Sequence, residues 1–573
     1  MPKARIINEA VDSFSLTENL IFYGLATILC ISTTIIVVDL NDIYMIEIPS
    51  HSGTLTEGII GIPRFINPLL ALSDSDRDMT TLIYSGLLRA TPDGTLVPDL
   101  AQSYSISPDG LTYTFVLKPN IVFHDNKPIT TDDVLFTVQK ARDPGLKSPK
   151  RPTWEGVVAK KINDREVQLI LKQPYSPFLE NATLGILPKH IWSTVPIEEF
   201  PFSQYNVQPV GSGPYQFKSI ERNSEGVPLY YRLEASKKYT FGTPYIKNIT
   251  LRFYQNNAEL IEAYKNDSID SLASISPKQG DELNTNGNRV ERTSLPRVFG
   301  IFFNQNQATV LANKEVRQAL DVATDKQAIV DKVLEGYGIA IKGPIPPGLF
   351  QINSESSNEP KLSEIDRVAA AKKILDDAKW KFNEQTKIYE KKLKKETLQL
   401  AFSISTSDAP ELKNAAEMVQ SMWTKIGAKV DLKIFDIGEL NQNVIRPRKY
   451  DALLFGEIIG RDLDLFAFWH SSQRNDPGLN IALYTNAKVD RFLDNARSTP
   501  DIEKREETYP ELQKEIENDI PAIFIYSPDF LYVVPKNLRG FSLGHITIPA
   551  ERFLSVSKWY VDTERVWKIF APK

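Results

Sequence analysis

A run of apolar residues near the start of the chain is its strongest hydrophobic signal. Residues 20–38 (LIFYGLATILCISTTIIVV) are 19 consecutive positions without a charged side chain. At a rise of about 1.5 Å per residue, a helix of this length just spans the hydrocarbon core of a bilayer. Lys3 and Arg5 precede the run, whereas the acids Asp39 and Asp42 follow it. Because basic residues favour the cytoplasmic side, we expect a cytoplasmic N-terminus and a domain outside the membrane.

Three other interpretations of this run fit less well. A cleaved signal peptide usually has a shorter apolar core and a small-residue cleavage site after it, and no such site follows here. A lipidated Cys30 would need small residues before it, but Ile28 and Leu29 are bulky. A buried helix of the fold is disfavoured because irregular polar stretches flank the run on both sides. We therefore expect an uncleaved single-span anchor within residues 1–50.

Beyond the anchor, the pattern changes to that of a globular protein. Residues 55–70 (LTEGIIGIPRFINPLL) predict a strand and a turn, and Asn67-Pro68 ends the segment. Residues 80–89 suit a helix. Strict alternation over residues 112–118 predicts a half-buried strand. Thr130 is typical of a helix N-cap, with the helix starting near Asp132.

The second half of the chain also contains both helical and strand-like spacings of apolar residues. Apolar residues at helical spacing predict one amphipathic helix over residues 314–336 and another over residues 367–379. Residues 397–405 predict a strand, residues 411–426 a helix and residues 429–434 a second strand. This β-α-β unit requires a partly parallel sheet. The sequence therefore predicts a mixed α/β protein with more than one lobe.

Two polar segments of the second half are expected at the surface. Residues 387–395 contain clustered lysines and suit a solvated turn or hairpin, and residues 354–360 (SESSNEP) suit a loop. We see no internal repeat.

Composition narrows the classes of function. At 573 residues the chain is too long for one hydrophobic core, so two or three domains are expected. The net charge is about −5 and no basic stripe alternates with aromatic residues, which argues against a nucleic-acid partner. Cys30 is the only cysteine, so an intramolecular disulfide and a cysteine-based metal site are excluded.

The sequence offers no constellation typical of catalysis. None of the five histidines lies four residues from another, and the zinc-hydrolase pattern H-E-x-x-H is missing. The glycines around Ser212 do not form a nucleophile motif, because Ser212 lies between them in the wrong frame and Pro214 follows. We expect His124 and His190 to be structural. We predict no enzyme, no metal site and no cofactor.

Ordered sequence blocks resemble a known family, the family 5 extracellular solute-binding proteins. These proteins are the dipeptide, oligopeptide and nickel receptors of ABC importers. The resemblance covers about residues 53–565. The blocks are IYSGLLR (83–89), VPDLAQSYSISPDGLTYTFVLKPNIVFHDNKPITTDDVLFT (97–137), LPKHIW (187–192), GSGPYQF (211–217), NKEVRQALDVATDKQAIVDKVLEGYG (313–338), AAKKILDDAKW (370–380), YTNAKVDRFLDNAR (484–497) and NDIPAIFIY (518–526).

This resemblance implies a two-lobed periplasmic-binding-protein-like fold of the class II type with an extra inserted subdomain. The lobes would close on the ligand by hinge motion. The implied pieces are residues 51–85, 210–290 and 530–573 for lobe I, residues 86–209 for the inserted subdomain and residues 291–529 for lobe II. The implied partners are a peptide or other small solute and ABC permease subunits. We expect a monomer attached to the membrane by its N-terminal helix.

The same resemblance places two segments at the ligand cleft. Residues 61–67 (GIPRFIN) match the family segment that lines the cleft from the first lobe. The segment after Tyr450-Asp451 matches the one that lines it from the second lobe. The ligand-binding candidates are Pro63, Arg64, Phe65, Asn67, Glu457, Arg461, Asp462 and Asn480.

The second segment departs from the family pattern. Peptide receptors carry G-W-x-x-D here, and the aspartate holds the peptide's free amino group. In this chain Gly456 matches the glycine, Glu457 stands at the tryptophan position and Gly460 at the aspartate position. Asp462 or Glu457 could substitute, or the ligand has no free amine at this point. Arg461 is a candidate for a ligand carboxylate or for a salt bridge between the lobes.

Two further functions stay open from the sequence. A cell-surface hydrolase or peptidase could reuse the fold if an acid of residues 455–480 were catalytic. A receptor-derived sensor without transport is the other. Trp469 and Phe466 suit a hydrophobic core rather than a ligand wall, and His470 suits either a structural hydrogen bond or the rim of the cleft.

Overall fold

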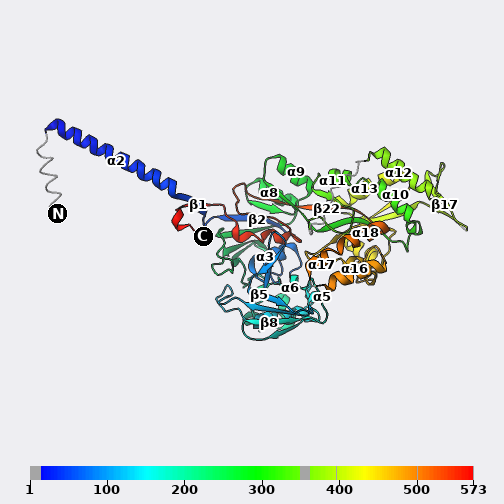
Figure 1. Cartoon of the computed structure of the whole chain (residues 1–573), viewed down its shortest axis with the longest axis horizontal. Coiled ribbons are helices and arrows are strands. Elements are labelled where there is room, and N and C mark those ends of the chain that lie inside the picture. Colours follow the sequence, from blue (N-terminus) through cyan, green and yellow to red (C-terminus); the bar gives the residue numbers. More distant parts are fainter. Residues whose placement is uncertain (1–14, 349–361, 395, 500, 572–573) are drawn as a thin grey trace.

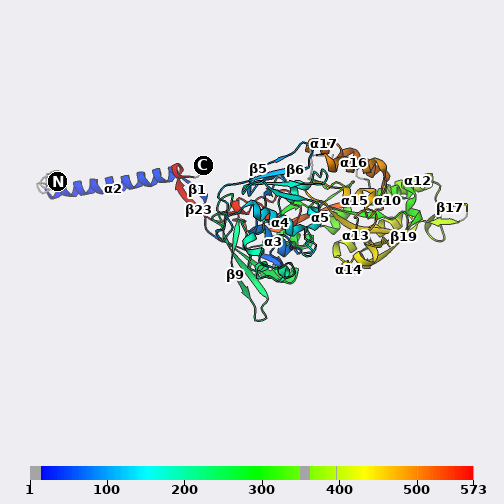
Figure 2. The same ribbon diagram turned by 90° about the horizontal axis from the view of Figure 1, so that it is seen from below.

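The computed structural model describes residues 15–348, 362–394, 396–499 and 501–571. Helix α2 (Leu16–Tyr44) projects from the globular body, and none of its residues is buried (Figures 1 and 2). The helix is long and apolar enough to cross a membrane. Ser15 caps its first turn together with Glu18. The helix is six residues longer at its C-terminal end than the apolar run predicts, because it continues through Asp39 and Asp42.

A single mixed sheet of 12 strands runs through both lobes. Its order is β20-β19-β21-β14-β22-β12-β2-β11-β10-β9, and β13 and β15 also pair with β22. The strands are β2 (Thr54–Ile60), β9 (Tyr215–Arg222), β10 (Pro228–Ala235), β11 (Asn248–Tyr254), β12 (Ser271–Ala273), β13 (Val290–Ser294), β14 (Arg297–Phe303), β15 (Gly338–Ala340), β19 (Ala401–Ser407), β20 (Lys429–Phe435), β21 (Ala452–Ile458) and β22 (Ala522–Val533).

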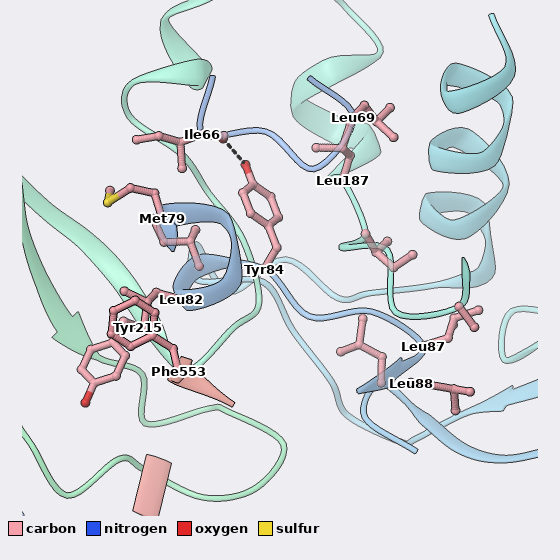
Figure 3. Packing of buried hydrophobic residues seen from close by; sticks show 14 of the residues in the cluster. Ile66, Leu69, Met79, Leu82, Tyr84, Leu87, Leu88, Leu187, Tyr215 and Phe553 are labelled. Carbon is pink, nitrogen blue, oxygen red and sulfur yellow. Dashed lines mark hydrogen bonds between the residues drawn. The ribbon is translucent and has the colours of Figure 1, made fainter. Parts of the chain in front are cut away.

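The first lobe contains one end of this sheet. In this lobe, β2 and the strands β9 to β13 pack against three helices. These helices are α3 (Asp74–Ile83), α8 (Asn257–Lys265) and α9 (Pro277–Thr285). The C-terminal segment returns to this lobe through the 3-10 turn η6 (Pro549–Phe553). Figure 3 shows its core around Tyr84, whose hydroxyl donates to the Ile66 carbonyl at 3.4 Å.

A four-stranded antiparallel unit extends the first lobe, in the order β5-β6-β8-β7 (Figure 1). The strands are β5 (Ala101–Ile106), β6 (Thr112–Leu117), β7 (Val158–Lys161) and β8 (Glu166–Ile170), and the helices used below are α4 (Thr131–Arg142) and α6 (Phe178–Asn181). Thr130 caps α4 together with Asp133, as its position predicts. The apolar side chains of this unit share one core with the first lobe.

The second lobe contains the other end of the sheet. Strands β19 and β20 are parallel and joined by α13 (Pro410–Lys425), which confirms the predicted β-α-β unit. The other helices are α10 (Lys314–Ala323), α11 (Lys326–Val333), α12 (Glu364–Asp377), α16 (Ala487–Ser498) and α18 (Tyr509–Asp519). The lysine-rich segment is part of a small sheet of β16 (Lys381–Asn383), β17 (Ile388–Lys392) and β18 (Thr397–Gln399).

Two chain segments cross side by side from one lobe to the other. Strand β22 pairs with β14 through Tyr526 and with β13 from Asp529 onward, so one continuous strand belongs to both lobes. At the crossing, Leu295 donates its amide to the Pro528 carbonyl at 3.1 Å, and the Ser527 hydroxyl donates to the Leu295 carbonyl at 2.7 Å. The two halves of the sheet are therefore connected through β22 at this crossing.

Two helix predictions were wrong. The segment 80–89 is not one helix, because Ser73 and Asp76 cap α3 earlier and the chain becomes extended at Tyr84. The segment 314–336 is two helices, α10 and α11, because the Asp325 side chain accepts the Ala328 amide and starts a new helix. The predicted surface loop over 354–360 lies outside the described residues.

A fully buried ion network fastens the C-terminal segment to the first lobe. Arg552 donates to both oxygens of Asp78 at 2.7 Å each and to Glu57 at 3.0 Å. Ser271 and Tyr532 donate to the other oxygen of Glu57. Burial raises the pKa of both carboxyl groups, and the nearby guanidinium opposes this rise. The network joins β2, α3, β12, β22 and η6.

Replacing Arg552 by Met should destabilise the protein strongly. The change leaves two buried carboxylates without their cation, and breaking such a pair costs roughly 3–5 kcal/mol. Denaturant unfolding followed by circular dichroism measures the loss. Arg539→Met is the matched control, since Arg539 is exposed on the same C-terminal segment. A loss for Arg552→Met as small as that of the control would contradict the assigned role.

Candidate functional site

A cavity of about 590 Å³ lies where the first lobe, the four-stranded unit and the second lobe meet. The second lobe contributes Ile458 and Arg461, and the other lining residues come from the rest of the chain. Ile458, the last residue of β21, is 58% exposed and faces this space. The volume lies within the usual range for pockets that bind small molecules.

The cavity wall carries charges of both signs. The four basic and three acidic lining residues are Arg77, Arg89, Lys150, Arg461, Asp99, Glu180 and Glu551. Arg89 is held in place because it donates to the Tyr239 hydroxyl at 2.6 Å and to the Leu554 carbonyl at 2.5 Å. Leu88, Trp154 and other apolar side chains cover the remaining wall. Such a site suits a ligand with charged ends and an apolar or mixed middle.

Arg461 reaches from the second lobe to two carboxylates of the first-lobe side. It lies 3.4 Å from Glu180 on α6 and 2.7 Å from Glu551 on η6, measured between nitrogen and oxygen. Its side chain is only 8% exposed. Burial raises the pKa of Glu180 to about 7, and the Arg461 guanidinium opposes the rise. These contacts join the lobes across the cavity, so the structure is a closed form.

A second contact between the lobes lies next to this one. The Tyr175 hydroxyl donates to Asp464 at 3.3 Å, and the Ser176 amide donates to the Arg497 carbonyl at 3.0 Å. Arg497 in turn binds Asp464 at 2.6 Å. The four-stranded unit therefore contacts the second lobe through the segment just before α6, which also carries Glu180.

The carboxylate of Glu180 approaches the backbone of Gly460. A β-carbon placed on Gly460 would lie 3.5 Å from one Glu180 oxygen. Gly460 stands where the sequence pattern expects an acidic side chain from the second lobe. In this chain, an acid from the first-lobe side approaches the same position.

Glu457 lies inside the second lobe. On β21 it pairs with Val298 of β14, and it is 3% exposed. It lies beside Trp469, which is itself fully buried, as the sequence predicts. Burial raises the pKa of Glu457 well above the ordinary carboxyl value, and the Trp469 indole lowers it only in part. Among the described residues no ion pair includes Glu457, and it is not part of the cavity wall. Burial therefore favours the protonated form of this carboxyl group.

The remaining candidates of the second lobe make internal contacts. Asp462 binds Arg505 at 2.5 Å, and burial raises its pKa while Arg505 opposes the rise. Asn480 is fully buried and donates to the carbonyls of His470 and Tyr484. Neither side chain belongs to the cavity wall.

The candidates of the first lobe lie on a loop fixed by Asp76. One Asp76 oxygen accepts the amides of Arg64 and Phe65, at 2.7 and 2.9 Å. Asn67 is fully buried and binds Asn206 at 3.2 Å, and Pro63 is buried while Arg64 is exposed. None of these four side chains is part of the cavity wall, although Pro68 and Ala71 on the same loop are.

The structure therefore brings one predicted residue, Arg461, to the cavity. Sequence reasoning missed Arg89, Asp99, Glu180, Tyr239 and Glu551. Arg89 ends the block IYSGLLR, so that block was a signal for it. The others could not be identified because only the folded chain brings them together.

One edge of β21 is open next to the cavity. Strand β14 covers one side of β21 over its whole length, whereas β19 pairs with the other side only at Ala452 and Leu453. Beyond Leu453, no strand in the described part of the chain pairs with this edge. The Leu454 carbonyl accepts the Thr406 hydroxyl of β19 at 2.9 Å, so only the backbone groups beyond Leu454 remain for an extended ligand.

The structure gives no geometric sign of a metal site. Within the described residues, no three His, Cys, Asp or Glu side chains are grouped so as to hold a metal ion. His124 receives the Gly211 amide at 3.3 Å and lies 3.1 Å from the Gly213 carbonyl, and burial lowers its pKa to about 4. His190 contacts Asp125 at 2.7 Å.

Comparison with known proteins gives one consistent result. Residues 95–477 match the model of the bacterial extracellular solute-binding proteins, family 5, middle region. The oligopeptide-binding protein AppA of Bacillus subtilis (strain 168) is 29% identical over 521 residues, which cover 90% of this chain and 92% of that protein.

Solved structures agree with this result. The structure of B. subtilis AppA in complex with a nonapeptide is 27% identical, has a TM-score of 0.67 and matches 90% of this chain and 100% of that one. The structure of NikZ from Campylobacter jejuni in complex with Ni(L-His) is 26% identical, has a TM-score of 0.68 and matches the same shares.

Glu457→Gln should stabilise the protein more at alkaline than at acidic pH. The folded state keeps a proton on Glu457 that the unfolded chain releases above its ordinary pKa of 4.5. Stability contributed by this group is therefore lost as pH rises above 4.5, by about 1.4 kcal/mol for each unit of the raised pKa. Thermal unfolding at pH 5 and pH 8 measures the difference. Glu155→Gln, at an exposed acid, should show none, and an equal effect of Glu457→Gln at both pH values would refute the assignment.

Proposed function

Because the chain belongs to family 5 of the bacterial extracellular solute-binding proteins, we propose that it captures a peptide between its two lobes and delivers it to an ABC permease. The observation that carries the peptide assignment is the open edge of β21 beside a closed cavity with charges of both signs. An extended peptide buries its backbone N–H and C=O groups, and a free strand edge can satisfy them without reading side chains.

We propose that Glu180 replaces the aspartate that the second lobe lacks. Its carboxylate lies beside Gly460, which the sequence resemblance aligns with the family's amine-binding aspartate. Glu551 contacts the same guanidinium of Arg461, so a ligand ammonium group would compete with Arg461 for two acids. A bound ammonium would lower the raised pKa of Glu180 and favour its ionised form. Arg461 then becomes free to bind a ligand carboxylate or to stay at the rim.

Hinge motion at the strand crossing would open the cleft. The moving bodies in this proposal are the predicted pieces 51–85, 210–290 and 530–573 with the subdomain 86–209 on one side, and 291–529 on the other. The crossing of Leu295 with Ser527 and Pro528 would flex. The Arg461 contacts and the Tyr175–Asp464 contact would break on opening.

We further propose that the protein is a monomeric receptor, not a catalyst. Helix α2 would be an uncleaved single-pass anchor with the N-terminus in the cytoplasm and both lobes outside. The protein would then bind peptides without changing them, and other subunits of the importer would hydrolyse ATP.

Oligopeptides should stabilise the full-length protein in detergent. At a ligand concentration of about 100 times Kd, the gain is about 2.7 kcal/mol, which for a chain of this size is a shift of about 2 °C in Tm. Ile458→Trp should reduce peptide affinity at least about tenfold, because the indole would occupy the part of the cavity beside the β21 edge. The matched control is Ile434→Trp, at an exposed position on β20. Binding of sugars or metal complexes in place of peptides would overturn the ligand assignment.

Glu180→Gln should weaken binding of peptides with a free amino group selectively. Loss of a charge-assisted hydrogen bond costs about 1.5–3 kcal/mol, or roughly 10- to 150-fold in Kd. Isothermal titration with one peptide and its N-acetylated form measures the difference, and the acetylated peptide should bind both proteins alike. If Glu180→Gln weakens both peptides equally, Glu180 does not recognise the amine.

A further inference from the structure

The end of the chain returns to the base of the N-terminal helix. Strand β1 (Met45–Pro49) follows α2 without an intervening residue and pairs antiparallel with β23 (Thr563–Trp567). The register joins Met45 to Trp567 and Pro49 to Thr563. Figures 1 and 2 show the C-terminus, in red, beside β1 at the end of the helix.

Side chains of β23 contact the last turns of the helix directly. The Trp567 indole N–H donates to the Asn41 side-chain oxygen at 2.8 Å. Arg565 forms an ion pair with Asp42 at 3.1 Å. The C-terminal strand is therefore fixed to α2 by two side-chain contacts in addition to its pairing with β1.

Apolar side chains gather around this junction and are exposed. Trp567 is 44% exposed, and Ile569 and Phe570 in the following 3-10 turn are 77% and 73% exposed. Ile43 and Tyr44, at the end of α2, are exposed as well. A soluble surface rarely concentrates so many large apolar side chains in short neighbouring segments.

The position of this cluster along α2 indicates that it lies at the depth of the membrane surface. The charge-free run ends at Val38, and Asn41 lies three residues further, or about 4.5 Å along the helix axis. Trp567 is bonded to Asn41, so its ring lies just outside the hydrocarbon core if the run spans it. Tryptophan and tyrosine prefer this interfacial depth, and the cations Arg565 and Lys568 suit the phosphate level.

We propose that the C-terminal segment Thr563–Ala571 is a second membrane contact, with Trp567, Ile569 and Phe570 in the outer headgroup interface. This inference rests on the proposed α2 anchor but not on the identity of the ligand. The anchor and the C-terminal segment contact the bilayer together. The two lobes are thereby held at a fixed orientation to the membrane instead of swinging on a tether.

Trp567 provides its own probe. The chain has seven tryptophans, and the other six (Trp154, Trp192, Trp380, Trp423, Trp469 and Trp559) are buried. The full-length protein is reconstituted into vesicles of phosphatidylcholine, with and without bromine on the acyl chains near the headgroup. The emission that is lost in Trp567→Phe reports on this residue alone. We expect the brominated lipid to remove most of that emission and aqueous iodide to remove little.

A double variant tests the rest of the surface. Ile569→Ser with Phe570→Ser should reduce quenching by brominated lipid severalfold and increase quenching by iodide. Phe202→Ser, which removes an exposed phenylalanine far along the chain, should change neither. Stabilisation by peptides shows that each variant is folded, because the exchanged residues lie away from the cavity.

Three results would overturn the inference. The first is quenching by iodide alone in protein that an alkaline carbonate wash does not remove from the vesicles. It would show that α2 spans the bilayer but that Trp567 lies in water. Protection from both quenchers would mean that protein, such as a second copy, covers the segment. Release of the chain by the wash would refute the anchor as well. Peptide binding, measured on the same samples, separates these results from a failure of the proposed function.

Discussion

The buried guanidinium of Arg552 holds together the parts of the first lobe that meet at the cleft. It lies between Glu57 on β2 and Asp78 on α3, in a place where an unpaired carboxylate would be strongly disfavoured. The next residue back is Glu551, which contacts Arg461 of the second lobe. The charge pairing inside the lobe thus fixes the turn that presents a carboxylate to the other lobe. Glu551 is joined to Arg552 by one peptide bond, so the position of its carboxylate in the closed cleft depends on the buried ion network.

The local hydrophobic pattern was sufficient to predict those helices and strands whose tertiary contacts favour the same structure. The β-α-β unit of β19, α13 and β20 follows from its periods alone, and the capped helix after Thr130 from one side chain. The single helix over 314–336 failed because the apolar period continues through a cap at Asp325. The spacing of apolar residues does not reveal where one helix ends and the next begins when both helices bury the same face.

The candidate site shows where sequence reasoning ends. The missing aspartate at Gly460 is visible in the sequence, but Glu180 comes from a distant part of the chain and meets it only after folding. Glu457 shows the opposite case, since its place in a cleft segment suggested ligand contact whereas its side chain turns into the lobe core. On a strand, neighbouring residues face opposite sides, so Ile458 reaches the cavity and Glu457 does not.

The direct passage from α2 into β1 has a consequence for the rate of transport. With α2 as the proposed anchor, a receptor without a linker would explore only the plane of the membrane, and its cleft would stay at one height above the permease. Encounter would then depend on the surface density of both proteins and not on the volume of medium outside the cell. A captured solute would be passed on at a high effective concentration even where the free solute is dilute.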